Sequence, residues 1–457
     1  MSKVLLIYPY FRPPRDRSVF RFPPLGICYI ASSLIKAGFE VQLLDCTFMD
    51  KSQALSQAQS SGADVVGIYC MVTMQDDCLW FARQLRATTR LLIVGGPLPT
   101  CDPLDFLSDF DVVVRGEAEA TVLAVLHAYS TGGEMSTIQG IAMRRETGPK
   151  GKPREETIFT PDRTFIKNLD ALAFPARHLL PNEKYIQFGR KKYGYAITTV
   201  MSTRGCPYDC EFCSNVIFGG SYRERSAGNI VDEIEQVLAL GYDRISFADD
   251  VFTLRNKRVL DICLEIKKRN LHFYWECLAR VDSLNDDTYT VMHQAGCRRV
   301  YFGIESGEDR ILKLMNKKIT AAQARQAVLA AHQAGMEVGA FFILFYPGET
   351  NETVLNTLRY ATSLPLDYLG LTMPYPLPGT ALYERVKSQV KREWHPGESV
   401  FGSHVLIYDG KFSETKMWFG IIKGRAQFEI KRRFGRLAPL ALKLFEKSTD
   451  WLFMRIK

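Results

Sequence analysis

Three cysteines within eight residues are the clearest chemical feature of this chain. Cys206, Cys210 and Cys213 have the spacing C-x3-C-x2-C. This spacing lets three thiolates reach one compact inorganic centre from a single loop. Iron–sulfur clusters are ordinarily held by four thiolates. A set of three leaves one metal position open, which is typical of a metal site that carries out chemistry.

Two other interpretations of these cysteines compete with a reactive centre. One is a structural zinc loop whose fourth ligand lies elsewhere in the chain. The other is three unrelated core cysteines. The close clustering, punctuated by Gly205 and Pro207, is not the pattern of a core segment.

The composition is that of an ordinary globular protein. The chain has 457 residues, of which 46% are hydrophobic and 24% charged, and this length suggests two or three domains. The N-terminal apolar run is too short for a signal peptide, and no apolar run approaches the ~20 residues of a membrane span. The other eight cysteines are scattered singly, so we expect reduced thiols and a cytoplasmic location.

The net charge of +8 belongs to the C-terminal segment. Residues 411–457 contain 12 Lys and Arg against 4 Asp and Glu, which accounts for the whole excess. The rest of the chain is neutral and gives no sign of a nucleic-acid-binding surface.

Strands and helices alternate in the first part of the chain. Short apolar runs predict strands at residues 3–8, 41–44, 64–69, 91–94 and 111–114, and helical stretches lie at 25–37, 51–60, 75–87 and 119–129. This alternation predicts a doubly wound parallel sheet, which binds ligands at the carboxyl ends of its strands. No G-x-G-x-x-G or Walker loop is present, so there is no dinucleotide or NTP signature.

The second half contains six further strand–helix pairs between residues 195 and 387. Their short connections predict a parallel barrel with its site at the carboxyl ends of the strands. An acidic pair, Asp249 and Asp250, follows the second strand and suits a cationic ligand, or else caps the next helix. Arg280 follows the third strand and suits a carboxylate, or else forms a surface ion pair.

The cysteine loop, including Phe212 before the last cysteine, resembles the cluster loop of the radical S-adenosylmethionine (SAM) superfamily. The resemblance implies a [4Fe–4S] cluster on Cys206, Cys210 and Cys213, with SAM bound at the open iron. It also implies cleavage of SAM to a 5′-deoxyadenosyl radical that abstracts hydrogen from an unreactive carbon. The expected barrel is the partial (β/α)6 form. The SAM contacts implied are Phe212, Asp249, Asp250, Arg280, Glu305, Ser306 and Pro374.

The first domain resembles the cobalamin-binding domain of the B12-binding branch of that superfamily. The matching segments are Pro24-Leu25-Gly26, Gly95-Gly96-Pro97 and Gly116-Glu117-Ala118-Glu119. The resemblance implies cobalamin contacts at Pro24, Thr73, Gly95, Gly96 and Glu117. No D-x-H occurs in the chain, which excludes the histidine-ligated mode, and Leu98 stands where relatives often carry histidine.

The fifth barrel strand departs from the family pattern. Relatives usually carry glycine at the position of Phe345, where the backbone approaches the cofactor. A ring at this position must point away from the cofactor or fill substrate space.

The predicted fold class is α/β. It comprises a Rossmann-like cobalamin-binding domain at residues 1–140, a linker at 141–190, a partial radical SAM barrel at 191–390, and a basic, mainly helical region at 391–457. This last region is interpreted either as a small helical domain with a solvated basic face, or as a basic amphipathic element that contacts an anionic membrane surface, an acidic substrate or a partner.

Three functions are weighed. The leading one is a cobalamin-dependent radical SAM methyltransferase acting on an unactivated carbon. The second is a radical SAM dehydratase, cyclase or rearrangement enzyme of natural-product or lipid biosynthesis that transfers no methyl group. The third is a non-enzymatic metal-binding scaffold. The expected partners are a small-molecule or lipid substrate and an electron donor such as flavodoxin or ferredoxin, without nucleic acid. No feature of the sequence specifies the substrate.

Overall fold

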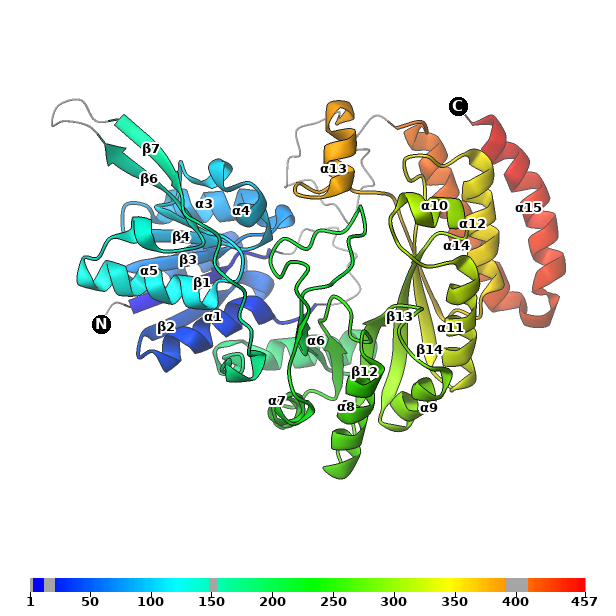
Figure 1. Ribbon diagram of the computed structural model, residues 1–457, viewed down its shortest axis with the longest axis horizontal. Coiled ribbons are helices and arrows are strands. Elements are labelled where there is room, and N and C mark those ends of the chain that lie inside the picture. The colour runs from blue at the N-terminus through cyan, green and yellow to red at the C-terminus, as the bar shows by residue number, and fades with distance from the viewer. Residues whose placement is uncertain (1–2, 12–20, 148–153, 391–409, 457) are drawn as a thin grey trace.

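The computed structural model describes residues 3–11, 21–147, 154–390 and 410–456, which form two α/β domains and a pair of C-terminal helices (Figure 1). Residues 391–409 of the predicted C-terminal region and residues 148–153 of the predicted linker lie outside the described residues. Among the described helices, none has both the length and the apolar character that a bilayer crossing requires.

The first domain is built on a seven-stranded sheet in the order β2-β1-β3-β4-β5-β6-β7. Its first five strands in sequence are parallel: β1 (Lys3–Tyr8), β2 (Glu40–Asp45), β3 (Val65–Tyr69), β4 (Leu91–Gly95) and β5 (Val112–Val114). The order reverses between β1 and β3, and ligands of such sheets bind beyond the carboxyl ends beside that point. The predicted doubly wound sheet is confirmed.

Helices cover both faces of this sheet: α1 (Leu25–Lys36), α2 (Lys51–Ser60), α3 (Gln75–Leu85), α4 (Pro97–Cys101) and α5 (Glu119–Thr131). Successive residues of β1 serve opposite cores because side chains alternate along a strand. Val4 and Leu6 pack with α1 and α5, whereas Leu5 and Ile7 pack with α2 and α3. This double burial explains why the strands are continuous apolar runs.

A β-hairpin extends the sheet beyond β5. Its strands, β6 (Ile141–Thr147) and β7 (Arg154–Phe159), add in antiparallel fashion, with Ile141 opposite Val114. This segment lies in the predicted linker. However, it belongs to the first sheet and covers the edge of the short β5, so the expected boundary at residue 140 falls between two strands of one sheet.

The second domain is a six-stranded, wholly parallel sheet in the order β15-β14-β13-β12-β11-β8. The strands are β8 (Ile197–Val200), β11 (Arg244–Phe247), β12 (Tyr274–Ala279), β13 (Cys297–Glu305), β14 (Glu337–Ile343) and β15 (Tyr368–Thr372). The two edge strands, β8 and β15, do not pair with one another in the described chain. This is the open barrel that the sequence predicts.

The helices of this domain follow its strands: α7 (Ala227–Ala239), α8 (Asn256–Lys268), α9 (Asp286–Gln294), α10 (Asp309–Leu314), α11 (Ala321–Gln333), α12 (Asn351–Ser363) and α13 (Ala381–Val386). Local capping sets several starts. Thr320 and Gln323 form a capping box at α11, and the Ser226 hydroxyl accepts from the Asn229 N–H at α7. An unpredicted helix, α6 (Asn182–Tyr193), precedes β8.

Two C-terminal helices, α14 (Glu414–Phe434) and α15 (Ala438–Arg455), pack together, and both contact α12 of the barrel. Figure 1 shows them at the end of the molecule farthest from the first domain. Phe345 lies at their base with a φ of +67°, in the left-handed region that favours glycine. Its ring points away from the barrel site and packs against Phe412 and Phe453, with centroid distances of 5.1 and 6.3 Å.

Gly420 on α14 leaves the space that the ring of Phe345 occupies. A Cβ added there would stand 2.5 Å from the ring's Cζ atom. Glycine to alanine inside a helix is usually stabilising by ~0.5–1 kcal/mol. For Gly420→Ala we expect the opposite, a loss of about 1–3 kcal/mol from overpacking. The check is urea unfolding with Gly228→Ala on α7 as the control, because the nearest atom to a Cβ there is a flexible arginine terminus 3.8 Å away. Stabilisation by both substitutions would contradict this packing.

Glu349, in the loop after β14, is buried with one carboxylate oxygen accepting from the Tyr346 N–H at 2.9 Å. Burial raises its pKa from the ordinary 4.5 to about 8. Between about pH 4.5 and 8 the Glu349 carboxyl is protonated in the folded protein and ionised in the unfolded chain. The free energy of unfolding therefore falls progressively as the pH rises through this range. Glu349→Gln removes this ionisable group. We expect the free energy of unfolding of the variant, measured against that of the wild type, to be about 3–5 kcal/mol higher at pH 8 than at pH 5. Urea unfolding across this range, with exposed Glu352→Gln as control, checks the difference.

Candidate functional site

The cysteine loop is closed at its base by a short antiparallel pair, β9 (Thr203–Arg204) and β10 (Arg223–Glu224). Gly205 opens the loop with a φ of +83°, and a Cβ there would lie 2.3 Å from the Ser221 carbonyl oxygen. Glycine is therefore required at this position. The Asn215 side chain donates to the Cys206 and Gly219 carbonyls at 3.2 and 2.5 Å, which folds the loop back on itself.

The second half of the loop is held by three other segments through Glu211. Its backbone N–H donates to the Met315 carbonyl at 3.0 Å, and its carbonyl accepts from the Leu382 N–H on α13 at 2.9 Å. Its carboxylate accepts from the Tyr346 hydroxyl at 2.6 Å and lies 3.1 Å from an Arg385 nitrogen. The loop is thus fixed before any cofactor binds.

The three thiols share one space at the open end of the barrel. Cys206 and Cys210 are partly exposed and Cys213 is exposed. The surrounding protein, which partly excludes water from the thiol, and then the charges of Cys210 and Cys206 raise the pKa of Cys213 to about 11. Burial likewise raises the pKa of Cys206. Three thiolates this close repel one another, so they suit a centre whose positive irons offset their charge.

No group of three His, Cys, Asp or Glu side chains in the described ranges converges on the position of a single metal ion. The ligands of a [4Fe–4S] cluster need not converge on one point, because each thiolate binds a separate iron. The three-cysteine loop fits such a cluster in ligand type and number, and the residues present suit it.

The acidic pair after β11 divides into two roles. Asp249 is buried, and its Oδ1 accepts from the backbone N–H groups of Ser202 and Thr203 at 2.6 and 2.9 Å. Its other oxygen accepts from the Ser202 hydroxyl. It therefore holds the chain that enters the cysteine loop, and its carboxylate is already occupied.

Asp250 is exposed and faces the cysteines. It accepts a hydrogen bond from the Gly205 backbone, and its charge acts on Cys206 and Cys213. The surrounding protein, and then the charge of Asp249, raise its pKa. Of the two carboxylates, Asp250 is the one placed to meet a cationic group beside the cluster loop.

Arg280 is buried beside the same loop. Its guanidinium forms a two-point pair with Asp282, at 2.9 Å for each contact, and donates to the Lys317 carbonyl at 3.1 Å. The guanidinium carbon also stands 3.5 Å from the centre of the Tyr208 ring. The surface ion pair weighed from sequence is thus a buried one, and it positions a residue of the cysteine loop.

Glu305 lies at a β-bulge in β13 with a φ of +72°. Its carboxylate forms an ion pair with the Lys317 ammonium at 2.9 Å. Burial by itself lowers the pKa of Lys317, but the charges of Glu305 and Cys210 outweigh it and raise the pKa. Lys317 also lies 5.7 Å from the Phe212 ring centre. The lysine therefore joins Glu305, Cys210 and Phe212 in one local group.

Two other predicted SAM contacts are covered by protein. Ser306 is buried, and its hydroxyl stands 3.1 Å from the Thr357 hydroxyl on α12. Pro374 is buried in the loop after β15. The side chain of Ser306 faces α12, so this segment would contact a ligand at the barrel mouth through its backbone.

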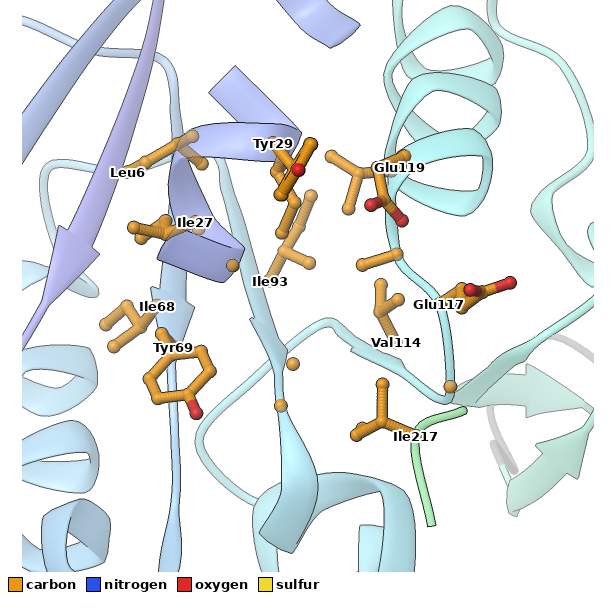
Figure 2. A pocket seen from close by; sticks show the side chains of 18 of the residues that line it. Leu6, Ile27, Tyr29, Ile68, Tyr69, Ile93, Val114, Glu117, Glu119 and Ile217 are labelled. Carbon is orange, nitrogen blue, oxygen red and sulfur yellow. The ribbon is translucent and has the colours of Figure 1, made fainter. Parts of the chain in front are cut away.

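A pocket of about 280 Å³ penetrates the first domain between its sheet and helices α1 and α5. Figure 2 shows apolar side chains around it, including Ile27, Ile93 and Val114, with the carboxylates of Glu117 and Glu119 at one side. Met201, Arg204, Ile217 and Phe218 of the second domain complete its wall. The pocket therefore reaches the boundary between the domains.

The glycines lining this pocket keep it open. A Cβ added at Gly26 meets no atom within 4 Å, and one at Gly116 meets only the Ile217 carbonyl at 4.0 Å. Gly95, Gly96 and Glu117, three of the five residues expected at cobalamin, also line the pocket. Pro24 and Thr73 are not among its lining residues. This apolar cradle with bare backbone has room for one part of a large organic cofactor such as cobalamin.

Glu117 has a role that the sequence did not reveal. Its carboxylate lies 3.0 Å from Arg204 and 2.7 Å from Arg223, and it accepts from the Ile166 N–H at 2.7 Å. Arg204 also pairs with Glu119 at 2.5 Å. All four charged side chains are at most 8% exposed. This group, named the interdomain charge cluster, joins β5 of the first domain to the strands that close the cysteine loop.

Two family models match the chain, one for each domain. The B12 binding domain matches residues 15–126, and the Radical SAM superfamily matches residues 200–361. An uncharacterized methyltransferase of Pyrococcus horikoshii is 34% identical over 401 residues, covering 84% of this chain and 83% of the relative. The chain belongs to the B12-binding branch of the radical SAM superfamily. It is therefore a radical SAM enzyme, in a family whose cofactors are a [4Fe–4S] cluster, SAM and cobalamin, and the scaffold hypothesis is set aside.

Other relatives of this radical SAM enzyme differ in reaction. The anaerobic magnesium-protoporphyrin IX monomethyl ester cyclase of Rubrivivax gelatinosus is 28% identical and covers 85% of this chain and 71% of its own length. A solved structure of OxsB, with aqua-cobalamin and SAM bound, matches 99% of this chain and 72% of that chain, with a TM-score of 0.78 and 16% identity. That likeness shows the same fold.

Sequence reasoning missed several residues that organise this site of the radical SAM enzyme. Arg204, Arg223, Tyr208 and Lys317 were not singled out as functional. Arg204 and Tyr208 lie within two residues of Cys206, so their position beside the cysteines was a usable signal. Arg223 and Lys317 carry no local signature, because their partners are 106 and 12 residues away.

The different roles of Asp249 and Asp250 can be tested by measuring the stability of variants. Asp249→Ala leaves two buried backbone N–H groups without an acceptor, and each such group costs about 1–3 kcal/mol. We expect a loss of about 2–5 kcal/mol for this variant, against less than about 1 kcal/mol for the exposed Asp250→Ala. Urea unfolding of the two variants measures the difference. Equal losses would contradict the separate roles.

Proposed function

We propose that this enzyme transfers a methyl group from SAM to an unactivated carbon of a small-molecule substrate, with cobalamin held between its two domains. The observation that supports it best is the pocket of the first domain, whose far wall is formed by Arg204, Ile217 and Phe218 around the cysteine loop. A ligand of the first domain and a cluster on the cysteines would therefore meet in one place.

Each cofactor supplies its own chemistry when bound: SAM on the cluster supplies a 5′-deoxyadenosyl radical, and cobalamin carries the methyl group. The protein's part is to hold and orient them. Cys206, Cys210 and Cys213 hold the cluster. Asp250 is assigned to the ammonium of SAM because its carboxylate is exposed beside the cysteines. The carboxylate of Asp249 is not available, because it accepts hydrogen bonds from backbone N–H groups.

Further residues around the loop and the pocket complete the assignment. Arg280, which is paired with Asp282, positions Tyr208 of the cysteine loop. Lys317 and Glu305 lie close to Cys210 and Phe212. Gly26 and Gly116 leave room for a cofactor against the backbone, and Glu117 holds the wall of that pocket in place.

A second candidate is a radical reaction without methyl transfer, such as a cyclisation. The 28% identity to an anaerobic magnesium-protoporphyrin IX monomethyl ester cyclase favours it. The two candidates share the cysteine loop and the SAM contacts, and differ in the fate of the methyl group. In either case we propose an electron donor such as flavodoxin or ferredoxin, and a cytoplasmic location in keeping with the free cysteines.

The test uses enzyme purified anaerobically with cobalamin, iron and sulfide, and SAM labelled with deuterium in its methyl group. With a small-molecule extract we expect 5′-deoxyadenosine, S-adenosylhomocysteine and a product that has gained the labelled methyl group. Deoxyadenosine without any labelled product would contradict the methyl transfer and favour the cyclase-like reaction.

Matched variants separate the parts of the site in that assay. Cys213→Ala should lose iron and all SAM cleavage, whereas Cys101→Ser, a partly exposed cysteine outside the loop, should keep both. Asp250→Asn should keep the cluster and raise the KM for SAM about tenfold or more, because a charge-assisted contact is lost. An unchanged KM would remove Asp250 from the SAM site.

A further inference from the structure

An apolar stripe starts at Leu437, the residue before α15, and follows the outer face of the helix with one gap at Lys447 and Ser448. Leu437, Leu440, Leu444 and Trp451 recur at spacings of three, four and seven residues, so they line one side of the helix. Their exposed fractions are 70%, 66%, 66% and 57%. Exposed apolar surface of this kind marks an interaction site.

The charges of α15 are sorted by face. Its two acidic residues turn inward, where Asp450 pairs with Lys423 at 2.9 Å and Glu446 accepts from Gln427 at 2.6 Å. The charged residues left exposed on the helix, Lys443, Lys447 and Arg455, are all basic. The apolar stripe is therefore bordered by positive charge alone.

The stripe is free of any role in the fold. The opposite side of α15 completes the core, where Phe453 is fully buried against Phe345 and Phe419. Figure 1 shows α15 as the outermost element at its end of the molecule, and its inner side packs on α14 and α12. The outer face can therefore meet a flat surface without rearrangement of the enzyme.

We propose that α15 docks this enzyme on an anionic lipid membrane, lying in the plane of the surface. Leu440, Leu444 and Trp451 enter the boundary between headgroups and acyl chains, and Lys443, Lys447 and Arg455 contact anionic headgroups. Leucine and tryptophan on one face with lysine and arginine at its borders is the composition of interfacial helices. Arg455 lies over the Trp451 ring at 4.0 Å, so the two enter the headgroup layer together.

Charge decides against a second copy of the chain as the occupant. A two-fold interface through this face would bring two surfaces that carry exposed Lys443, Lys447 and Arg455 together. An anionic surface is complementary to these basic residues, whereas a second copy repels them. The docking goes beyond the proposed reaction and does not depend on which radical chemistry occurs.

The test is flotation of the full-length holoenzyme with vesicles of phosphatidylglycerol and phosphatidylcholine in equal parts, against vesicles of phosphatidylcholine alone. We expect binding to the anionic vesicles that weakens as salt is added, and at least about tenfold weaker binding to the neutral ones. Leu440→Glu/Leu444→Glu should weaken the binding to anionic vesicles by about a hundredfold. Leu264→Glu on α8, where the leucine is 65% exposed, should leave it unchanged.

A charge-reversed pair tests the basic border separately. Lys443→Glu/Lys447→Glu should weaken binding about tenfold or more, and Lys257→Glu/Lys268→Glu on α8, with the same change in net charge, should not. Equal binding to neutral vesicles, equal losses in the α8 variants, or no binding at low salt would overturn the proposal. So would a dimer in light scattering that Leu440→Glu/Leu444→Glu converts to monomer. Deoxyadenosine formation without vesicles should be the same in all these variants.

Discussion

The interdomain charge cluster is the interaction on which the arrangement of this enzyme depends. Arg204 and Arg223 belong to the strands that close the cysteine loop, and Glu117 and Glu119 follow β5 of the other domain. Because all four charges are buried, removing one leaves its partners without compensation, which typically costs about 3–5 kcal/mol. A second buried group, Glu233 with Arg177 and Arg225, repeats this pattern nearby. The domains are thus held in one relation, with the pocket of the first facing the cysteines of the second.

That relation gives the two cofactors of the family one meeting place. The cysteine loop is anchored through Asp249, Glu211 and Arg280 to three different parts of the barrel. The pocket is kept open by glycines whose missing side chains leave the backbone bare. Rigid loops and pre-formed space are what a radical enzyme needs, because positioning decides which hydrogen atom is taken.

The C-terminal helices show how the barrel tolerates a departure from its family pattern. Phe345 stands in a left-handed conformation that favours glycine, and its ring turns outward into a space made by Gly420 and Phe453. The burial of a large aromatic side chain offsets the backbone strain. Between the same helices, the buried Lys423 forms an ion pair with Asp450. Only part of the basic excess of this segment is therefore exposed on the surface.

Much of the fold follows from local pattern. Apolar runs, capping residues and turn glycines decided the strands and helices of both domains, and the cysteine spacing decided the chemistry, because these signals lie within a few residues of one another. What only the tertiary structure decided are the partners of charged side chains distant in sequence. Glu117 was expected at a cofactor and holds two arginines, one of them 106 residues away. Asp249 and Asp250 are adjacent and alike in sequence, yet one binds backbone and the other faces the cysteines. Position in the folded chain sets which group a charge meets, and no local pattern records it.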